Sequence, residues 1–353
     1  MLLEKYRPKS CLVTKSTRVL KPRFPVVDAH NHLGEDFGGG WTHRPVEELI
    51  GVLDEAGIRL YVDLDGGWGE DILEMHIEKF KQAYPERFQV FGGVNWDQWK
   101  ALGEAFPRWA AERLVRQKEM GAEGLKIWKN FGLKVTDQSG RLVRIDDPRL
   151  DPLWDTAGEL KLPVMIHVAD PVAFFDPLDE TNERWEEMND NPDWQFPSPP
   201  YPPFTSIMEG LANLLKRQPK TIFIGAHVGC YAENLGWVGR LLDLCPNFYV
   251  DISARIGELG RQPYSARKFF LNYADRILFG SDFGPDLEAY RLAYRFLESD
   301  DEYFNYNADE TPKQGRWYVF GLHLPDEVLR KVYFENAEKL LRPNRSQAGT
   351  KER

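Results

Sequence analysis

The chain has 353 residues, of which 42% are apolar and 13% aromatic, so it can bury the core of one large domain or two ordinary ones. Its formal net charge of −10 argues against nucleic acid or an anionic membrane surface as a partner. No stretch approaches the roughly 20 apolar residues of a membrane span, and the basic segment 1–24 lacks the apolar core of a secretory signal, so we expect neither.

After the N-terminal extension of residues 1–24, short apolar segments alternate with longer helix-like segments up to residue 341. Most of the short segments are rich in β-branched or aromatic residues and end in Gly, Asn or Asp. This composition is typical of parallel strands that are covered on both faces. The predicted strands are 25–32, 58–65, 88–95, 124–129, 163–169, 221–228, 247–253 and 276–283.

The segments between the strands have the pattern of helices. Residues 45–56, for example, begin with a proline and end before Gly57, which is typical of a helix start and end. The other predicted helices are 70–83, 105–120, 150–161, 206–217, 232–244, 264–273 and 326–341. Eight strands alternating with eight helices predict an α/β fold of the (β/α)8 or TIM-barrel type, rather than an open doubly wound sheet. No GxGxxG motif follows the first strand, which argues against dinucleotide binding.

Three further segments lie outside the alternation. Residues 170–205, after strand five, are rich in Pro, Trp, Phe and acidic residues, and we interpret them as a lid over the barrel mouth. The alternatives are a structural insertion packed against the barrel and an arm that contacts a second subunit. A homodimer is therefore possible. Residues 284–325 form an extended, partly helical region after strand eight, and 342–353 a C-terminal tail. The three cysteines have no CxxC spacing, which is typical of a cytoplasmic protein.

Ionisable side chains gather where predicted strands end. His30 and His32 close the first strand and, two residues apart, leave it on the same face. His167, His227 and Asp282 end strands five, six and eight. Barrel enzymes build their sites at this end of the strands, and converging imidazoles with a carboxylate suit a divalent metal ion. We therefore predict a metal site, and expect His43, His76 and His323 at the surface.

The motifs in this order resemble the amidohydrolase superfamily, and within it the amidohydrolase-related (amidohydrolase 2) branch. The resemblance spans about residues 25–341 and includes the segments VVDAHNHLG, IGAHVG, FGSDFG and VYFENAEKLL. The branch contains metal-dependent TIM-barrel hydrolases, hydratases and nonoxidative decarboxylases. The resemblance thus implies a metal-dependent enzyme.

By this resemblance, His30, His32, His167 and Asp282 hold one divalent ion, usually zinc. His227 matches a histidine that polarises the substrate or carries protons. Asp282 would serve twice, as a ligand and as the base that takes a proton from metal-activated water.

Lys126 on strand four has three interpretations. Superfamily members with two metals use a carbamylated lysine on this strand as a bridging ligand. In the mononuclear branch, the amine would instead neutralise a substrate anion at the site. A structural ion pair is the third reading. Lys126 alternates with Leu125 and Ile127, so its side chain can face the barrel interior.

Our first expectation is hydrolysis, in which activated water attacks an ester, lactone or amide of a small polar or carboxylated substrate. Nonoxidative decarboxylation of an aromatic or unsaturated carboxylic acid is the alternative, and a non-catalytic metabolite-binding barrel is a third reading from another class. Arg44, Trp128 and Arg255 are candidates for substrate binding, although packing at the barrel mouth explains each of them equally well. The same holds for Asp65 and Asp251.

Overall fold

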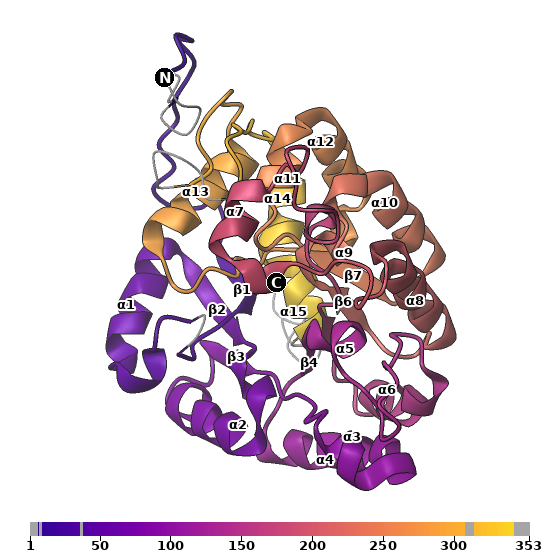
Figure 1. Ribbon diagram of the computed structural model, residues 1–353. Coiled ribbons are helices and arrows are strands. Elements are labelled where there is room, and N and C mark those ends of the chain that lie inside the picture. Colours follow the sequence, from indigo (N-terminus) through magenta and orange to yellow (C-terminus); the bar gives the residue numbers. More distant parts are fainter. Residues whose placement is uncertain (1–5, 7–8, 36–37, 308–313, 342–353) are drawn as a thin grey trace.

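The computed structural model describes residue 6 and residues 9–35, 38–307 and 314–341. Short strands lie in the middle of the molecule and helices surround them (Figure 1). In chain order the strands are β1 (Val26–Asn31), β2 (Ile58–Asp63), β3 (Phe88–Val90), β4 (Leu125–Ile127), β5 (Val164–Ile166), β6 (Phe223–Gly225), β7 (Phe248–Asp251) and β8 (Ile277–Leu278).

Every strand pairs in parallel with the next strand of the sequence within two groups, β1-β2-β3 and β4-β5-β6-β7-β8. A parallel bridge between Gly92 and Leu125 joins the two groups on one side. On the other side, the Ala29 N–H donates a hydrogen bond of 3.0 Å to the Phe279 carbonyl. The strands thus close on themselves, which confirms the predicted (β/α)8 barrel.

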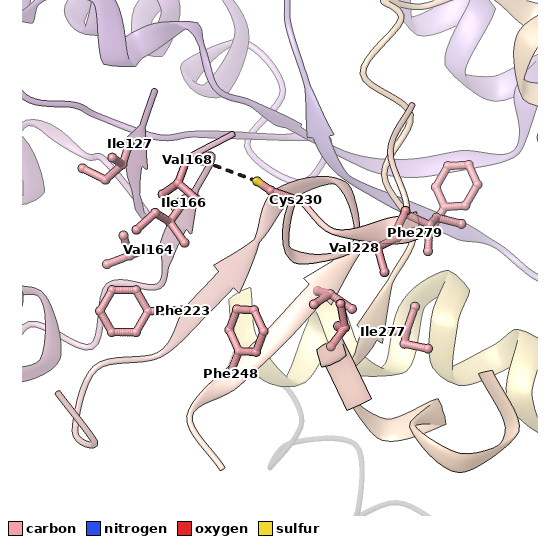
Figure 2. Close-up of a cluster of buried hydrophobic side chains, with 14 of the residues drawn as sticks. Ile127, Val164, Ile166, Val168, Phe223, Val228, Cys230, Phe248, Ile277 and Phe279 are labelled. Atoms are coloured by element: carbon pink, nitrogen blue, oxygen red, sulfur yellow. Dashed lines mark hydrogen bonds between the residues drawn. The ribbon is translucent and has the colours of Figure 1, made fainter. Parts of the chain in front are cut away.

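Two layers of buried apolar side chains follow the alternation of the strands. The layer inside the barrel includes Val27, Leu60, Met165, Ile224 and Leu278, and continues to Ala337 and Leu341 of the last helix. The layer between strands and outer helices is seen in Figure 2. It includes Ile127, Val164, Ile166, Phe223, Phe248 and Ile277. Lys126 pairs in register with Met165, so the lysine belongs to the inner layer.

The main helices lie where the sequence predicts them. They are α1 (Val46–Ala56), α2 (Glu70–His76), α4 (Phe106–Met120), α6 (Asp151–Glu159), α8 (Phe204–Arg217), α10 (Leu235–Leu244), α12 (Pro263–Asn272), α14 (Asp326–Arg330) and α15 (Asn336–Leu341). A π-helical turn, η11 (Lys331–Glu335), joins α14 to α15, and another, η4 (Ile77–Gln82), continues α2. The strands are shorter than predicted, because ladder bonds stop where the chain turns into the loops that carry polar residues.

The segment 170–205 is folded against the barrel and contains the short helices η7 (Val172–Phe174), α7 (Trp185–Asp190) and η8 (Pro192–Trp194). Arg184 anchors it. This side chain is 1% exposed and pairs with Glu187 in α7 and with Glu258 in α11 (Ile256–Arg261), which follows β7. A buried guanidinium needs such partners, because an uncompensated charge in the interior is costly. Whether the segment moves as a lid stays a prediction.

The extended region after β8 contains α13 (Leu287–Glu298). The N-terminal extension runs along it, where the Thr17 N–H and hydroxyl donate to the two oxygens of Asp301 at 2.6 and 2.7 Å. The Arg23 N–H donates to Glu298 at 3.0 Å. The predicted C-terminal tail, 342–353, lies outside the described residues.

Two findings concern the sequence expectations directly. In the described part of the chain, no helix has the length and apolar character needed to cross a membrane. His76, which we expected at the surface, is fully buried, and its Nδ1 lies 2.5 Å from Asp63 Oδ2. The expectation for His76 is wrong because the carboxylate at the end of β2 provides a buried partner that local sequence does not reveal.

Asp28 of β1 forms hydrogen bonds with the segment that follows β8. Its fully buried carboxylate accepts hydrogen bonds from the Ser281 N–H at 3.0 Å and the Ser281 hydroxyl at 2.6 Å. It also accepts from Tyr290 of α13 at 2.7 Å and from Asn31 at 2.8 Å. These bonds hold the segment after β8 against β1.

We expect Asp28→Ala to lower the free energy of unfolding by about 2–4 kcal/mol, because several buried donors would lose their acceptor. Tyr290→Phe removes one of these bonds and should cost only about 1 kcal/mol. Urea denaturation followed by circular dichroism measures both. Equal losses in the two variants would contradict the central place of Asp28.

Candidate metal centre

His30, His32 and Asp282 meet where β1 and β8 end. The backbone N–H groups of Ser281 and Asp282 donate to the His30 carbonyl at 3.2 and 3.0 Å, which brings Asp282 over the first strand. Asp282 Oδ1 lies 3.1 Å from His32 Nε2 and 3.7 Å from His30 Nε2. The ligand atoms of the three residues all lie within 4.8 Å of one another. Two imidazoles and a carboxylate at this spacing can hold one divalent ion.

Gly280 makes this approach possible. A Cβ atom on this residue would lie 2.9 Å from the His30 Cβ, which is closer than side chains tolerate. The seam between β8 and β1 therefore needs a residue without a side chain at this point.

His227 reaches the same place from β6. Its Nε2 lies 3.6 Å from Asp282 Oδ2, and its ring centroid lies 5.0 Å from that of His30. His30, His227 and Asp251 form a second group whose ligand atoms lie within 4.8 Å of one another. The structure thus places His227 beside the Asp282 carboxylate.

A left-handed turn presents His227. His227, Val228 and Cys230 have φ angles of 57°, 59° and 61°, a conformation that costs a residue with a side chain roughly 1–2 kcal/mol. Asp251 accepts the His227 N–H at 3.1 Å, and the Cys230 sulfur accepts the N–H of Val168 at 3.4 Å, drawn in Figure 2. These contacts hold a strained turn in place, as is common at functional sites.

The other nitrogen of each clustered imidazole has a fixed partner. Asp251 Oδ2 lies 2.9 Å from His30 Nδ1, and Asp65 Oδ1 lies 2.7 Å from His32 Nδ1. The Ser253 carbonyl lies 2.9 Å from His227 Nδ1. In a neutral ring, a partner that accepts from Nδ1 leaves the lone pair on Nε2, the form that binds a metal or takes a proton. His32 Nε2 lies 3.1 Å from Asp282 Oδ1 and shares a proton with it, which a bound ion would displace.

His167 lies beside this cluster and is directed differently. Its ring centroid is 4.5 Å from that of His227, and its Nε2 lies 3.4 Å from Asp170 Oδ1. The Nε2 atom is buried and has no hydrogen-bond partner. Asp170 in turn lies 2.5 Å from Lys129 Nζ. A buried imidazole nitrogen without a hydrogen bond is a suitable metal ligand, because coordination would satisfy it.

Lys126 is 1% exposed, and its Nζ lies 3.3 Å from His30 Nε2. Burial lowers the pKa of the Lys126 amine to about 8, although Asp282 and Asp251 attract its positive charge. The lysine therefore stands inside the barrel at the candidate centre. This position is compatible with each of the three roles considered for it.

The acidic and basic groups of the cluster shift the pKa values of one another. Burial would raise the pKa of Asp282, but attraction to His30 and the hydrogen bond from His32 outweigh burial and hold it well below its usual range. Burial would lower the pKa of His32, yet Asp282 and Asp65 raise it to about 9. Burial lowers the pKa of His167 to about 4, against the pull of Asp170. Asp282 is thus a carboxylate and His167 a neutral imidazole near neutral pH, the forms that bind metals.

A cavity of about 1340 Å³ opens beside Asp282. Its walls come from four parts of the chain: the N-terminal extension, the segment 170–205, the loop after β7 and the region after β8. Trp194, Ile252, Phe279 and Phe283 are among its apolar lining residues. Of the residues of the candidate centre, only Asp282 lines this cavity, so the three parts added to the barrel enclose space for a ligand that reaches the centre at Asp282.

The structure distributes the predicted substrate-binding residues unevenly. The Trp128 ring stacks on the His32 ring, with 5.1 Å between the centroids. Arg255 is buried near His227. Burial lowers the pKa of His227, and the positive charge of Arg255 lowers it further. Arg44 lies elsewhere, over the Trp41 ring at 3.5 Å and 3.4 Å from Glu48, and does not line the cavity that contains Asp282.

Sequence analysis did not indicate two residues at the site, Asp170 and Ser253. Asp170 lies beside His167, three residues earlier, and the Ser253 hydroxyl lies 3.0 Å from His30 Nδ1 and from His227 Nδ1. Asp170 lies three residues after His167, and a charged residue so soon after a strand-end histidine is the one signal that could have indicated it.

We expect Asp251→Ala and Asp65→Ala each to weaken metal binding about 10–100-fold, because loss of the Nδ1 partner frees the ring of His30 or His32 to rotate and lowers its basicity. Equilibrium dialysis of the purified protein against Mn²⁺ and Zn²⁺ measures this. Asp275→Asn is the matched control, since its 72% exposed carboxylate pairs with Lys331. Unchanged affinity in both Ala variants would refute the proposed support of the histidines.

Solved structures share this fold. A dihydroxybenzoic acid decarboxylase from Polaromonas sp. JS666 aligns with a TM-score of 0.53 and 16% identity over 85% of this chain and 87% of its own. A 2,6-dihydroxybenzoate decarboxylase from Rhizobium aligns with a TM-score of 0.55 and 15% identity over 91% and 99%. A 5-carboxyvanillate decarboxylase from Sphingomonas paucimobilis aligns with a TM-score of 0.50 and 13% identity over 84% and 82%.

No curated protein matches the chain. A family model described as amidohydrolase matches residues 70–342, which is most of the barrel, although His30 and His32 precede the match. The chain therefore belongs to the amidohydrolase family of metal-dependent enzymes.

Proposed function

We propose that this protein is a metal-dependent, nonoxidative decarboxylase of an aromatic carboxylic acid. The observation that carries the proposal is the similarity of its whole barrel to decarboxylases of hydroxylated aromatic acids, together with a buried His/Asp cluster at the mouth. Hydrolysis, which the sequence analysis placed first, has less support, because the similar structures with a stated reaction described above all decarboxylate.

We propose His30, His32, His167 and Asp282 as the residues that hold the ion. Imidazole nitrogens with one ionised carboxylate suit a divalent transition metal. The ligand atoms of His30, His32 and Asp282 lie within 4.8 Å of one another, whereas His167 is not in this group and lies beside it. The sequence resemblance implies zinc, whereas the Polaromonas decarboxylase contains manganese, so Mn²⁺ and Zn²⁺ are the two ions to compare. When bound, the ion would supply a Lewis acid that neutralises the substrate carboxylate.

In the proposed reaction, the bond between the ring carbon and the carboxylate breaks, CO₂ leaves, and the ring carbon takes a proton. One proton must therefore reach the ring carbon. Asp282 is ionised and burial holds the pKa of His227 well below its usual value, so this proton comes from water in the cavity. Asp282 lines the cavity and its Oδ2 lies 3.6 Å from His227 Nε2, so these two groups can relay the proton. Lys126 adds positive charge beside His30, and Trp128 adds an aromatic face over His32.

A cytoplasmic location and a homodimer complete the proposal. The first is supported only by the cysteine spacing and the second by the interpretation of residues 170–205. Size-exclusion chromatography with light scattering tests the dimer.

The central test supplies 2,6-dihydroxybenzoate to protein loaded with Mn²⁺ or Zn²⁺, with a set of lactones and amides in parallel. We expect CO₂ release from the acid, no turnover of the lactones or amides, and loss of activity after chelation that the added ion restores. Turnover of a lactone or amide without CO₂ release from any aromatic acid would overturn decarboxylation in favour of hydrolysis.

His227 and His167 have different proposed roles, so their variants should differ. We expect His227→Asn to lower kcat about 10²–10⁴-fold and to keep the metal, because it removes a proton-transfer partner. His167→Asn should lose metal as well as activity. Metal analysis beside kinetics separates the two, and His43→Gln, whose side chain is 81% exposed, is the control. Equal metal loss in both variants would contradict the division of roles.

A further inference from the structure

We propose that Arg18 of the N-terminal extension is a specificity-determining residue that binds a second anionic group of the substrate, distinct from the carboxylate that is lost. The inference rests on the proposed decarboxylation and narrows its substrate class to aromatic acids with an additional negative charge. Arg18 and Asp282 line the same cavity, and a ligand long enough to span it would contact both.

The cavity is large for a small-molecule site. Its volume of about 1340 Å³ exceeds the roughly 300–1,000 Å³ of a typical small-molecule site. A single aromatic ring with one carboxylate leaves much of this space to water. The cavity therefore has room for a substrate with a further substituent.

Hydrogen bonds hold the extension in place on both sides of Arg18. On one side, Thr17 donates two hydrogen bonds to Asp301. On the other, the Leu20 carbonyl accepts from Arg291 at 3.4 Å. Val19 between them packs against the hydrophobic core. The backbone of Arg18 is thus positioned before any ligand arrives, which reduces the entropy cost of using its side chain.

Three cationic side chains, those of Arg18, Arg291 and Arg295, line the cavity. Arg291 lies 2.5 Å from Glu288 and 2.9 Å from Glu55, and Arg295 lies 2.7 Å from Asp301. Their charges are already compensated. Among the described residues, no carboxylate pairs with Arg18, which is exposed. Its guanidinium can therefore bind a carboxylate through two parallel hydrogen bonds.

The acids on the wall complete the comparison. Glu187 pairs with Arg184, Glu288 pairs with Arg291, and Asp286 accepts the N–H of Ala289 at 2.8 Å. Asp190, at the end of α7, is exposed and lies on the same wall. A negative charge there would repel an anionic substrate. Removing the charge of Asp190 should therefore change KM in the direction opposite to removing the charge of Arg18.

The experiment compares two acids with metal-loaded, full-length protein: 2,6-dihydroxybenzoate, with one carboxylate, and 5-carboxyvanillate, with two. For Arg18→Gln we expect KM for the dicarboxylate to rise about three- to fivefold, the range of an exposed ion pair, with kcat unchanged. KM for the monocarboxylate should stay the same. Arg18→Lys should restore most of the difference, and Lys21→Gln, an exposed residue of the same extension that does not line the cavity, should behave as wild type.

Asp190→Asn should lower KM for the dicarboxylate, because a repulsive charge is removed. A rise in KM like that of Arg18→Gln would instead mean that Arg18 acts by pairing with Asp190 and not by binding the substrate, and would overturn the proposal. Equal effects of Arg18→Gln on both acids, or none, would overturn it as well.

Binding separates this inference from the proposed reaction. If neither acid releases CO₂, isothermal titration of the metal-loaded protein with benzene-1,3-dicarboxylate and with benzoate still tests Arg18. The proposal survives if wild type prefers the dicarboxylate and Arg18→Gln loses that preference. Absence of any preference in wild type overturns it, whatever the reaction proves to be.

Discussion

The hydrogen bonds between β1 and the segment after β8 are the contacts on which the candidate centre depends. The His30 carbonyl accepts from the backbone of Ser281 and Asp282, and Asp28 holds Ser281 from the opposite side. Residues about 250 positions apart in the sequence thus become neighbours. The same bonds close the barrel and place the Asp282 carboxylate over His30 and His32, so the stability of the fold and the geometry of the site are not separable here.

The candidate centre depends secondly on the carboxylates that accept hydrogen bonds from its histidines. Asp65 and Asp251 each accept from an Nδ1 atom, and this direction of the proton turns the Nε2 atoms of His32 and His30 toward Asp282. Buried acids thereby offset the positive charge that a divalent ion and Lys126 would bring into the barrel. A centre of this kind can accept a metal without leaving a large uncompensated charge in the interior.

Segments added to the barrel decide what can reach the centre. The extension, the segment 170–205 and the region after β8 together form the wall of the large cavity, and buried Arg184 joins the second of them to the loop after β7. None of these parts supplies a residue to the His/Asp cluster except Asp282, which marks the start of the third. The barrel therefore carries the chemistry, and the additions shape the ligand space around it.

The order of strands and helices could be predicted from the sequence, because the apolar segments and their Gly, Asn and Asp endings depend on local chemistry. The sequence also indicated that His30, His32 and Asp282 stand at strand ends, since position along a parallel strand sets the face of the barrel. The partners of these residues depend on the tertiary structure. Asp251 pairs with His30 and Asp65 with His32, across 221 and 33 positions of the sequence. No local pattern encodes such pairs, because closure of the barrel and the course of its loops set the distances between residues that are far apart in the chain.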